Sequence, residues 1–302
     1  MPRKTSQTSP SKPGWFSLVR RLLPRLSAPA GPTGSRPQPS AAACAPEEAV
    51  RGGAHYLEAL AVCHRLLKPQ HYLEIGVRSG HSLALTSCAA IAVDPAPELA
   101  RELAATTRLF TVTSDEFFAE QGALLSQEPP DFAFVDGMHL FEYALRDFLN
   151  IERSCAPGCL VAVDDVFPSH PAQASRERHS RVWTGDVWKL HRTLAAHRPD
   201  LFLLPLDTLP TGLLLVAGLD PANTLLRDRY AELVSNASSA EDVPPAAVLQ
   251  REGALPLGHP VVSAVLLALA DLRRAVAPPG EVSARLRAVV LDASRSPGRT
   301  GG

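Results

Sequence analysis

The chain has 302 residues, of which 45% are hydrophobic and 20% are charged, so it is long enough for one large domain with appendages and can bury a sizeable core. This composition excludes a collagen-like, a wholly disordered and a disulfide-framework protein. The formal net charge is -1, but residues 1–46 hold seven of the 30 basic residues and none of the 31 acidic ones. Residues 47–302 therefore hold more acidic than basic residues. Because binding of nucleic acid requires a surplus of basic side chains, we expect this part of the chain to bind a small molecule and no nucleic acid.

The first 46 residues are predicted to form a disordered, basic tail, since they contain nine of the 28 prolines. The run from Trp15 to Leu26 mixes apolar and Arg residues, and an amphipathic anchor is its alternative interpretation. The five cysteines form no CxxC motif or metal spacing, which favours reduced thiols and a cytoplasmic location. No apolar run is long enough to predict stable membrane insertion, and Pro260 to Ala270 is expected to be a buried helix.

Residues 47–70 are predicted to form a helix, after which short apolar runs alternate with segments of helical period. This alternation is typical of a parallel sheet covered by helices. Seven strands are predicted, over Tyr72–Ile75, Ile91–Val93, Leu109–Val112, Phe132–Val135, Leu160–Val163, Leu201–Leu204 and Leu213–Val216. Helices are predicted between them, over Ser82–Ala90, Pro97–Ala105, Asp115–Leu125, Phe141–Cys155 and Thr184–His197.

The last two predicted strands are separated only by Pro205 to Gly212, which is too short for a parallel crossover. We therefore expect an α/β fold whose mostly parallel sheet ends in an antiparallel edge hairpin, with helices on both faces. Three further helices are expected within residues 221–292. The predicted organisation is a tail over 1–46, an α/β domain over 47–220 and a C-terminal helical extension over 221–302.

Two glycines, Gly76 and Gly80, lie in the turn between the first predicted strand and helix, shortly after Glu74. Glycine permits a tight turn and the close approach of a ligand, and the N-terminus of the following helix favours an anion. Asp94 follows Glu74 by twenty residues, at the end of the second strand, where a carboxylate can accept hydrogen bonds from ribose hydroxyls. Together these residues indicate a nucleoside-containing cofactor.

This region resembles the class I S-adenosylmethionine-dependent methyltransferases, which have a Rossmann-like, seven-stranded sheet with an antiparallel hairpin. Glu74, Gly76 and Gly80 match the ExGxxxG form of their first motif, whereas Arg78 stands where many members have a middle glycine. The resemblance implies that this loop binds the amino-acid end of S-adenosylmethionine, although Glu74 holding only the loop together is the alternative. The implied cofactor-binding residues are Glu74, Gly76, Arg78, Ser79 and Gly80, with Asp94 at the ribose and Ser114 and Asp115 on the adenine side.

A second group of polar residues follows the fourth and fifth strands: Asp136 and His139 after one, Asp164 and Asp165 at the end of the other. The carboxyl ends of parallel strands lie at one edge of a sheet, so these side chains are expected to converge beside the loop from Gly76 to Gly80, called the glycine loop below. Acids that lie close together repel one another unless a cation compensates, and oxygen ligands favour Mg²⁺. The alternative is that Asp164 caps the following segment and Asp136 only supports the cofactor.

Methyl transfer to a hydroxyl gives this arrangement a chemical purpose, because a divalent cation lowers the pKa of the hydroxyl and a neutral histidine can accept its proton. The spacing also resembles the macrocin-type, metal-dependent O-methyltransferases. Their wider group has the signature FVDGxHxxExxxxD, which is matched here by Phe134, Val135, Asp136, Gly137, His139, Glu142 and Asp147. The resemblance covers about residues 70–218, and it implies Asp136, Asp164 and Asp165 as metal ligands, with His139 as general base and Asp136 as its catalytic neighbour.

The sequence thus predicts an S-adenosylmethionine-dependent methyltransferase that acts on a hydroxyl of a sugar or another small molecule, with Mg²⁺. A NAD-dependent oxidoreductase is one alternative, disfavoured by Arg78 and by the edge hairpin, and a non-catalytic nucleoside-binding module is another. Trp183 and Trp188 either line an acceptor pocket or pack in the core. Residues 221–302 either cap that pocket or form a homodimer face.

Overall fold

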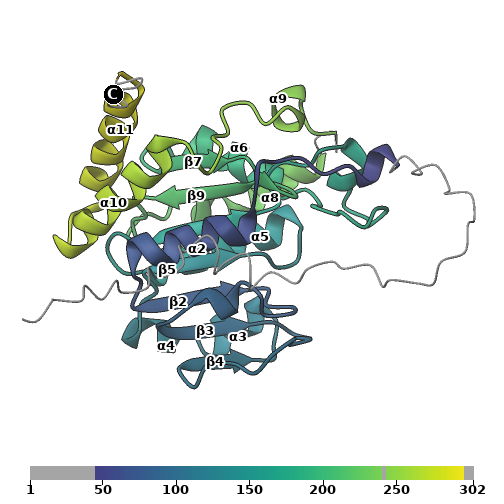
Figure 1. Cartoon of the computed structure of the whole chain (residues 1–302). Coiled ribbons are helices and arrows are strands. Elements are labelled where there is room, and N and C mark those ends of the chain that lie inside the picture. The colour runs from purple at the N-terminus through teal and green to yellow at the C-terminus, as the bar shows by residue number, and fades with distance from the viewer. Residues whose placement is uncertain (1–44, 240–242, 296–302) are drawn as a thin grey trace, which may run out of the picture. The chain divides into compact units, whose positions relative to one another are not determined.

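The computed structural model describes residues 45–239 and 243–295, so most of the predicted tail, with Trp15 to Leu26, lies outside the described residues. A seven-stranded sheet with the spatial order β4-β3-β2-β5-β6-β9-β7 occupies the centre of the described part (Figure 1). Its strands are β2 (His71–Ile75), β3 (Ala89–Val93), β4 (Thr107–Phe110), β5 (Phe132–Val135), β6 (Leu160–Asp164), β7 (Phe202–Leu206) and β9 (Leu213–Ala217). All seven overlap the strands that the sequence predicts.

The sheet is parallel from β4 to β6, and β9 runs antiparallel to both of its neighbours, β6 and β7. The predicted fold class, a mostly parallel sheet with an antiparallel hairpin at one edge, is confirmed. In the register of the sheet, Glu74 lies opposite Phe134, and Phe134 lies opposite Ala162. Neighbours in register point to the same face, so these three positions share one face of the sheet.

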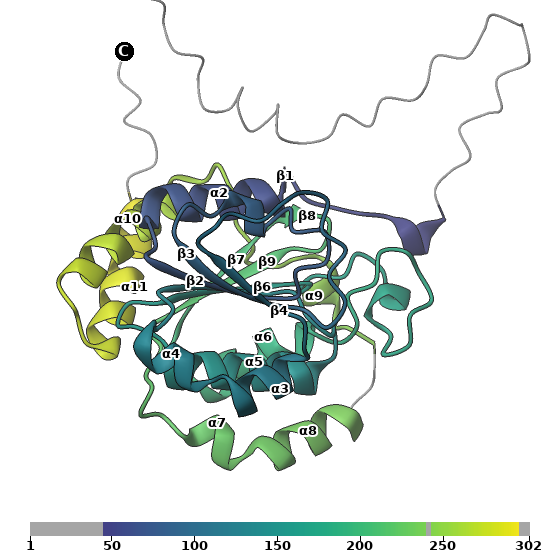
Figure 2. The ribbon, with the colours of Figure 1, turned by 90° about the horizontal axis from the view of Figure 1, so that it is seen from below.

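Helices cover both faces (Figure 2), and each face buries an apolar cluster. One face packs against α2, α10 and α11, the other mainly against α3, α5, α6 and α8. Strands β5, β6 and β9 are buried along their whole length, as expected for central strands covered on both sides. The helices are α2 (Tyr56–Leu67), α3 (Ser114–Glu120), α4 (Ala123–Gln127), α5 (Phe141–Ser154), α6 (Trp188–His197), α7 (Leu225–Asp228), α8 (Tyr230–Ser239), α9 (Ala246–Leu249), α10 (Pro260–Arg274) and α11 (Pro279–Arg295).

Two predicted helices are wrong. The helix expected over Ser82–Ala90 is a single 3₁₀ turn (Leu83–Leu85), because Thr86 adopts an extended conformation and Ala89 already begins β3. The segment expected as a helix over Pro97–Ala105 is irregular, since its backbone bonds to the glycine loop instead: two of its N–H groups donate to the carbonyls of Arg78 and Ser79. Both errors concern segments that brace the predicted cofactor loop.

The other helix predictions are correct in type and differ in extent. The helix over Asp115–Leu125 is divided at Gly122 into α3 and α4, and a capping box of Thr113 and Glu116 begins α3. Helix α6 begins at Trp188 rather than at Thr184. Within the described part of residues 221–292 there are five helices instead of three, because α7 and α9 add one short turn each.

The remaining elements are short. A 3₁₀ turn (Pro46–Glu48) precedes β1 (Ala54–His55), which pairs in parallel with β8 (Thr208–Leu209), and a further 3₁₀ turn spans Pro171–Ala174. No helix in the described ranges is both long and apolar enough to cross a membrane. The cysteines at positions 63, 88, 155 and 159 are free thiols.

Candidate functional site

The glycine loop turns sharply at Gly76, which has a φ of 86°. A Cβ at this position would lie 1.9 Å from the carbonyl oxygen of Asp136, so only glycine allows the loop after β2 to contact the loop after β5. Gly80 also has a positive φ, of 71°. Between them Arg78 adopts the left-handed conformation with a φ of 45°, which is strained for a residue that has a Cβ.

Asp94 follows β3 and braces the glycine loop. Its Oδ2 accepts hydrogen bonds from the backbone N–H groups of Val77 (2.9 Å) and Arg78 (2.7 Å), and its Oδ1 accepts one from Ala96 (2.8 Å). The carboxylate predicted at the ribose therefore already holds the loop in shape through two charge-assisted bonds, and a third bond fixes the backbone that follows Asp94.

Glu74 lies beneath the same loop and is fully buried. Its two carboxylate oxygens accept hydrogen bonds from the hydroxyls of Tyr72 (2.8 Å) and Ser82 (2.7 Å). Burial raises the pKa of Glu74 to about 8, against the opposing effect of these two bonds. Among the other predicted loop residues, the Ser79 hydroxyl is 2.5 Å from Nδ1 of His81.

Asp136, His139 and Asp165 come together where β5 and β6 end. Nε2 of His139 is 3.3 Å from Oδ1 of Asp136, and Nδ1 is 2.9 Å from Oδ2 of Asp165. One ligand atom from each residue lies within 4.8 Å of the others, so the three can share one metal ion. Asp164, the third predicted ligand, is outside this group, and its Oδ1 accepts a hydrogen bond of 3.0 Å from the backbone N–H of Asp165.

The backbone at this cluster is strained, and its charged groups shift one another's pKa. His139 and Asp165 both have positive φ values, 56° and 64°. Burial alone lowers the pKa of His139, but the carboxylates of Asp165 and Asp136 outweigh it and raise that pKa well above its usual value. Burial, followed by repulsion from Asp165 and Asp136, raises the pKa of Asp164 well above its usual range. Repulsion among these carboxylates thus opposes their ionisation, and a bound cation would relieve that repulsion.

The segment before α6 covers His139. The ring of Trp183 stacks on the imidazole, with 5.2 Å between ring centroids and 13° between the planes. Gly185 has a φ of 52°, and a Cβ there would lie 1.7 Å from the carbonyl oxygen of His139. Trp188, by contrast, is buried in the apolar cluster of the α5 face. Of the two tryptophans, only Trp183 reaches the site.

A buried acid fastens this segment to α5. Asp186 is fully buried and accepts hydrogen bonds from the backbone N–H of Phe141 (2.7 Å), from Arg176 (2.8 Å) and from Lys189 (3.1 Å). Arg176 also pairs with Glu142 at 2.6 Å, which gives this residue of the strand-four signature a structural role. These ion pairs fix the segment that carries Trp183.

The residues predicted on the adenine side have protein partners. Asp115 forms a bidentate ion pair with Arg146, whose Nε and Nη2 donate to Oδ1 and Oδ2 at 2.8 and 2.5 Å. Ser114 bonds to Asp147, which is 2% exposed, and burial raises the pKa of Asp147 to about 7. Oδ1 of Asp147 is buried and has no hydrogen-bond partner. Asp147 and Asp136 both line a small cavity, and this acceptor of Asp147 lacks a donor.

Tyr56, at the start of α2, is a site residue that the sequence did not single out. Its ring stacks on Phe134, and its pKa is raised by burial first and then by four carboxylates, those of Asp164, Asp136, Glu74 and Asp165. The helical period placed it among core residues, and nothing in the local sequence marks it as different. The packing of α2 on the sheet brings its phenol near these carboxylates.

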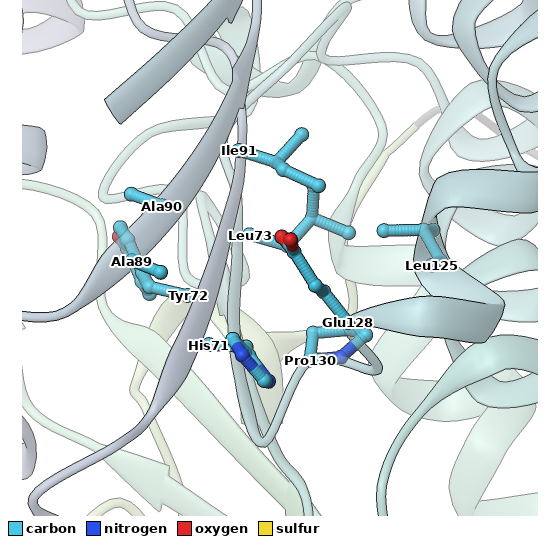
Figure 3. A pocket seen from close by; sticks show the side chains of 9 residues that line it. All are labelled: His71, Tyr72, Leu73, Ala89, Ala90, Ile91, Leu125, Glu128 and Pro130. Atoms are coloured by element: carbon cyan, nitrogen blue, oxygen red, sulfur yellow. The ribbon is translucent and has the colours of Figure 1, made fainter. Parts of the chain in front are cut away.

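A second hollow lies at the opposite, amino end of β2 and β3, next to α4 (Figure 3). Its lining is mostly apolar, from residues such as Leu73, Ile91 and Leu125, together with His71 and Glu128. None of the predicted site residues lines it. The chemistry therefore gathers at the carboxyl edge of the sheet, as expected for an open parallel sheet.

Residues 73–166, which span β2 to the end of β6, match the family model of a methyltransferase domain. The chain carries a methyltransferase domain. The match contains Glu74, the glycine loop and the cluster of Asp136, His139 and Asp165, so both groups of predicted site residues lie within the methyltransferase domain. No curated protein matches the chain.

Several solved structures are similar to this chain. An O-methyltransferase from Bacillus cereus in complex with SAH is 16% identical, and the match covers 53% of this chain and 79% of that one, with a TM-score of 0.41. The O-methyltransferase TomG from Streptomyces achromogenes, involved in tomaymycin synthesis and in complex with SAM, is 20% identical over 53% of this chain and 78% of that one, with a TM-score of 0.41. The SAH-bound methyltransferase PaMTH1 from Podospora anserina is 18% identical over 53% and 76%, with a TM-score of 0.42.

Proposed function

We propose that the methyltransferase domain transfers a methyl group from S-adenosylmethionine to a hydroxyl oxygen of a small molecule, such as a sugar, with the help of a divalent cation. The observation that carries this proposal is the convergence of Asp136, His139 and Asp165 directly beside the glycine loop. A proton acceptor and a cation-binding carboxylate pair next to a nucleoside site are what methylation of a neutral hydroxyl requires.

The site fits S-adenosylmethionine in its charge and in its one unused acceptor. Asp136 places a carboxylate next to the loop, where the ammonium and sulfonium groups of the cofactor would lie. The unpartnered Oδ1 of Asp147, beside Ser114, is an acceptor that suits the amino group of the adenine ring. We assign Asp94 a supporting role at the ribose, because its oxygens already bind the loop.

The donor set also fits a hard divalent cation. Two carboxylates and one imidazole nitrogen converge within 4.8 Å, and carboxylates of this kind suit Mg²⁺ or Mn²⁺. A bound cation would supply the positive charge that orients the acceptor hydroxyl and lowers its pKa. Asp136 and Asp165 would hold it, and Asp164 would orient Asp165 through the bond to its backbone N–H.

His139 is the proposed general base. Without a cation, the carboxylates of Asp165 and Asp136 raise the pKa of His139, so the imidazole keeps its proton. Neutralising those carboxylates lowers that pKa toward the range in which histidine accepts a proton. Trp183 keeps the ring in place by stacking, and its carbonyl oxygen is 2.9 Å from Nδ1. Nδ1 therefore carries the hydrogen, and Nε2, which faces Asp136 at 3.3 Å, is the nitrogen that would receive a proton.

The proposal is tested by calorimetric titration of the full chain with S-adenosylmethionine, with and without MgCl₂. We expect binding, and release of S-adenosylhomocysteine from a panel of sugars and phenols that depends on the cation. Asp165→Asn should abolish the dependence on the cation, whereas Asp271→Asn, at an exposed position on α10, should change nothing. Failure of the wild-type chain to bind the cofactor overturns the proposal, and binding without turnover of any acceptor favours a non-catalytic nucleoside-binding module.

The roles of His139 as base and as ligand make different predictions for His139→Ala. If the histidine is the base, Mn²⁺ should bind the variant with an affinity within about threefold of wild type while methyl transfer falls by roughly 10²- to 10⁴-fold. Loss of Mn²⁺ binding together with activity would show instead that the histidine is a ligand. Electron paramagnetic resonance of added Mn²⁺ measures the first quantity directly.

A further inference from the structure

The turn after β6 carries Asp165 and has no regular structure of its own. Strand β6 ends at Asp164, and the four residues that follow belong to no helix or strand. Phe167, two residues beyond Asp165, is held at both of its backbone groups. Its N–H donates to the carbonyl of Thr211 (2.7 Å), and its carbonyl accepts a hydrogen bond from Nη2 of Arg251 (3.3 Å). The path of the chain beyond Asp165 is therefore set by residues that are distant in sequence.

Arg251 joins this turn to the connection that follows β7. Its buried guanidinium donates to five oxygens, which belong to Asp207 (Oδ1, 2.8 Å), Thr208 (carbonyl, 2.9 Å), Pro210 (carbonyl, 2.7 Å), Phe167 (carbonyl, 3.3 Å) and Ser169 (Oγ, 3.3 Å). Strands β6 and β7 both run antiparallel to β9, so the two segments leave the sheet at the same edge. A guanidinium can hold both at once because its donors lie in a rigid, planar fork.

The position of Arg251 is energetically unfavourable in two respects. Its φ of 57° is in the left-handed region, where a residue with a Cβ is strained. Its charge is buried, Asp207 is the one acid in the described part of the chain that pairs with it, and its Nε has no hydrogen-bond partner there. Burial lowers the pKa of Arg251, against the opposing effect of the carboxylates of Asp207 and Asp164. Because apolar side chains often stabilise such a position equally well, we infer that the guanidinium does more than hold the fold together.

The segment that carries Arg251 is itself fastened to the sheet. Leu255 donates its backbone N–H to the carbonyl of Pro205 (3.0 Å), and its carbonyl accepts the N–H of Asp207 (2.8 Å). This segment therefore lies along the end of β7. Arg251 is outside the matched domain, which ends at residue 166. A residue from the C-terminal part of the chain thus braces the turn that carries Asp165.

We propose that Arg251 is a positioning residue for Asp165. By fixing the turn after β6, it keeps the carboxylate of Asp165 at 2.9 Å from Nδ1 of His139 and sets the place at which this carboxylate would meet a divalent cation. The inference rests on the proposed function, because it takes Asp165 as a cation ligand. Arg251 acts through the turn rather than on the substrate, so its loss should weaken cation binding and leave the nucleoside site intact.

Two binding measurements on the full chain test this role. Arg251→Met should bind Mn²⁺, followed by electron paramagnetic resonance, roughly 10- to 100-fold more weakly than wild type, which is the usual effect of removing a residue that orients a metal ligand. Its affinity for S-adenosylhomocysteine, measured by calorimetry, should stay within about threefold of wild type, because Arg251 donates to the segments after β6 and β7 rather than to the glycine loop. Arg251→Lys should bind Mn²⁺ with an intermediate affinity, since one ammonium group keeps the charge but cannot hold both segments.

Arg198→Met is the matched control, because Arg198 is also a buried arginine. It pairs with Glu152 (2.8 Å) and Asp200 (2.7 Å), at the end of α5 that lies away from His139. Urea unfolding should show that both variants are less stable than wild type, since each loses a buried hydrogen-bonding group. Only Arg251→Met should lose affinity for Mn²⁺.

Hydrogen exchange gives a readout that needs no cation. Mass spectrometry of the ligand-free protein should show exchange at residues 164–170 several times faster in Arg251→Met than in wild type, because the carbonyl of Phe167 loses its donor. The same residues should exchange at the wild-type rate in Arg198→Met.

The outcomes distinguish this role from the proposed function. Wild-type affinity for Mn²⁺ in Arg251→Met, an equal loss in Arg198→Met, or an equal loss of S-adenosylhomocysteine binding would overturn the positioning role although the proposed function stands. If Arg251→Met does not fold, Arg251→Lys decides, and unchanged Mn²⁺ affinity with unchanged exchange at residues 164–170 overturns the role. If wild type binds neither Mn²⁺ nor S-adenosylhomocysteine, the proposed function itself fails, and the role of Arg251 fails with it.

Discussion

Two glycines, Gly76 and Gly185, join the loops of the site by leaving room for a neighbouring carbonyl group. Gly76 lies against the carbonyl of Asp136, and Gly185 lies against that of His139. Both have positive φ values, so a side chain would be strained even if space were made. Each glycine thus sets the position of one residue of the cluster of Asp136, His139 and Asp165 without contributing a functional group of its own.

Gly185→Ala should therefore destabilise the protein by at least about 2 kcal/mol, because the new Cβ would lie 1.7 Å from a carbonyl oxygen. Urea unfolding followed by circular dichroism measures the change. Gly258→Ala, where nothing lies within 4 Å of the new Cβ, is the control and should stay within about 0.5 kcal/mol of wild type. Equal stability of the two variants would contradict the close approach of Gly185 to the backbone of His139.

Glu74 should make the stability of the ligand-free protein depend on pH. Its pKa in the folded state is about 8, above the ordinary value of 4.5, so the folded protein binds the proton more tightly than the unfolded chain does. The stability that it contributes is fully present below pH 4.5 and is lost as the pH rises through 8. At about 1.4 kcal/mol per pKa unit, this loss amounts to a few kcal/mol. Urea midpoints between pH 5 and pH 8.5 should fall less for Glu74→Gln than for wild type.

Glu102→Gln, at an exposed position, is the control for this titration and should follow the wild-type pH profile. A Glu74→Gln profile parallel to wild type would show that Glu74 does not carry the shift. Asp147, with a pKa raised to about 7, acts in the same direction, so the difference between variants is the informative quantity.

The sequence identified the residue types of the site better than their partners. Asp136, His139 and Asp165 could be expected together, because strand ends converge at one edge of a parallel sheet. The hydrogen bonds from the loop N–H groups to Asp94 could not be predicted, since they depend on atomic positions that no residue pattern encodes. The same holds for Tyr56, whose helical spacing is that of an ordinary core residue.

At the scale of elements, a fully buried amide connects the segment over residues 169–185 to residues 47–49. Nε2 of Gln173 donates to the carbonyls of Glu47 (2.9 Å) and Ala49 (2.8 Å), and its Oε1 accepts from the backbone N–H of Ser169 (2.7 Å). This amide fastens residues 47–49 to the segment that carries Trp183 over the imidazole of His139. Two parts of the chain far apart in sequence therefore share one polar anchor.

Gln173→Ala should loosen both parts, because it leaves buried backbone groups without partners, at about 1–3 kcal/mol each. Limited proteolysis should then cut residues 169–185 several times faster than in wild type. Glu177→Ala, in the same segment at a side chain that is 87% exposed, should leave the cleavage rate unchanged. Unaltered cleavage of Gln173→Ala would mean that other contacts hold the segment.

The errors at this scale have a common physical cause. Apolar spacing in residues 82–90 fits a helix, but pairing of Ala89 and Ala90 with β2 claims these residues for β3. Residues 97–105 lose their helix to hydrogen bonds with the glycine loop. The strands were predictable because their burial on both faces makes them uniformly apolar, whereas local helices compete with tertiary contacts.

At the scale of the whole molecule, the C-terminal helices complete the core. Helix α10 buries Val262, Leu266 and Leu269 against the face that also holds Phe134 of β5, so residues beyond the matched domain cover the strand that leads to Asp136. Arg273, near the end of α10, donates to the carboxylate of Asp131 at the opposite end of β5, at 3.0 Å. The extension is therefore packed on the sheet that carries the site.

Leu269→Ala should cost about 2–5 kcal/mol of stability, because it opens a cavity beside the sheet at a fully buried position. Leu267→Ala, on the same helix but at a side chain that is 52% exposed, should change stability by less than about 0.5 kcal/mol. Denaturant unfolding distinguishes them. Similar values for both would show that α10 does not pack on the sheet in solution.

The insertion of β9 between β6 and β7 has a consequence for any attempt to isolate the matched domain. A fragment that stops at residue 166 would contain β6 without the strand that pairs with its outer side. The exposed ladder would run along Val161, Ala162, Val163 and Asp164, all of them buried in the whole chain. Open, mostly apolar strand edges recruit further copies of themselves, so the fragment should self-associate into β-rich aggregates while the full chain stays dispersed.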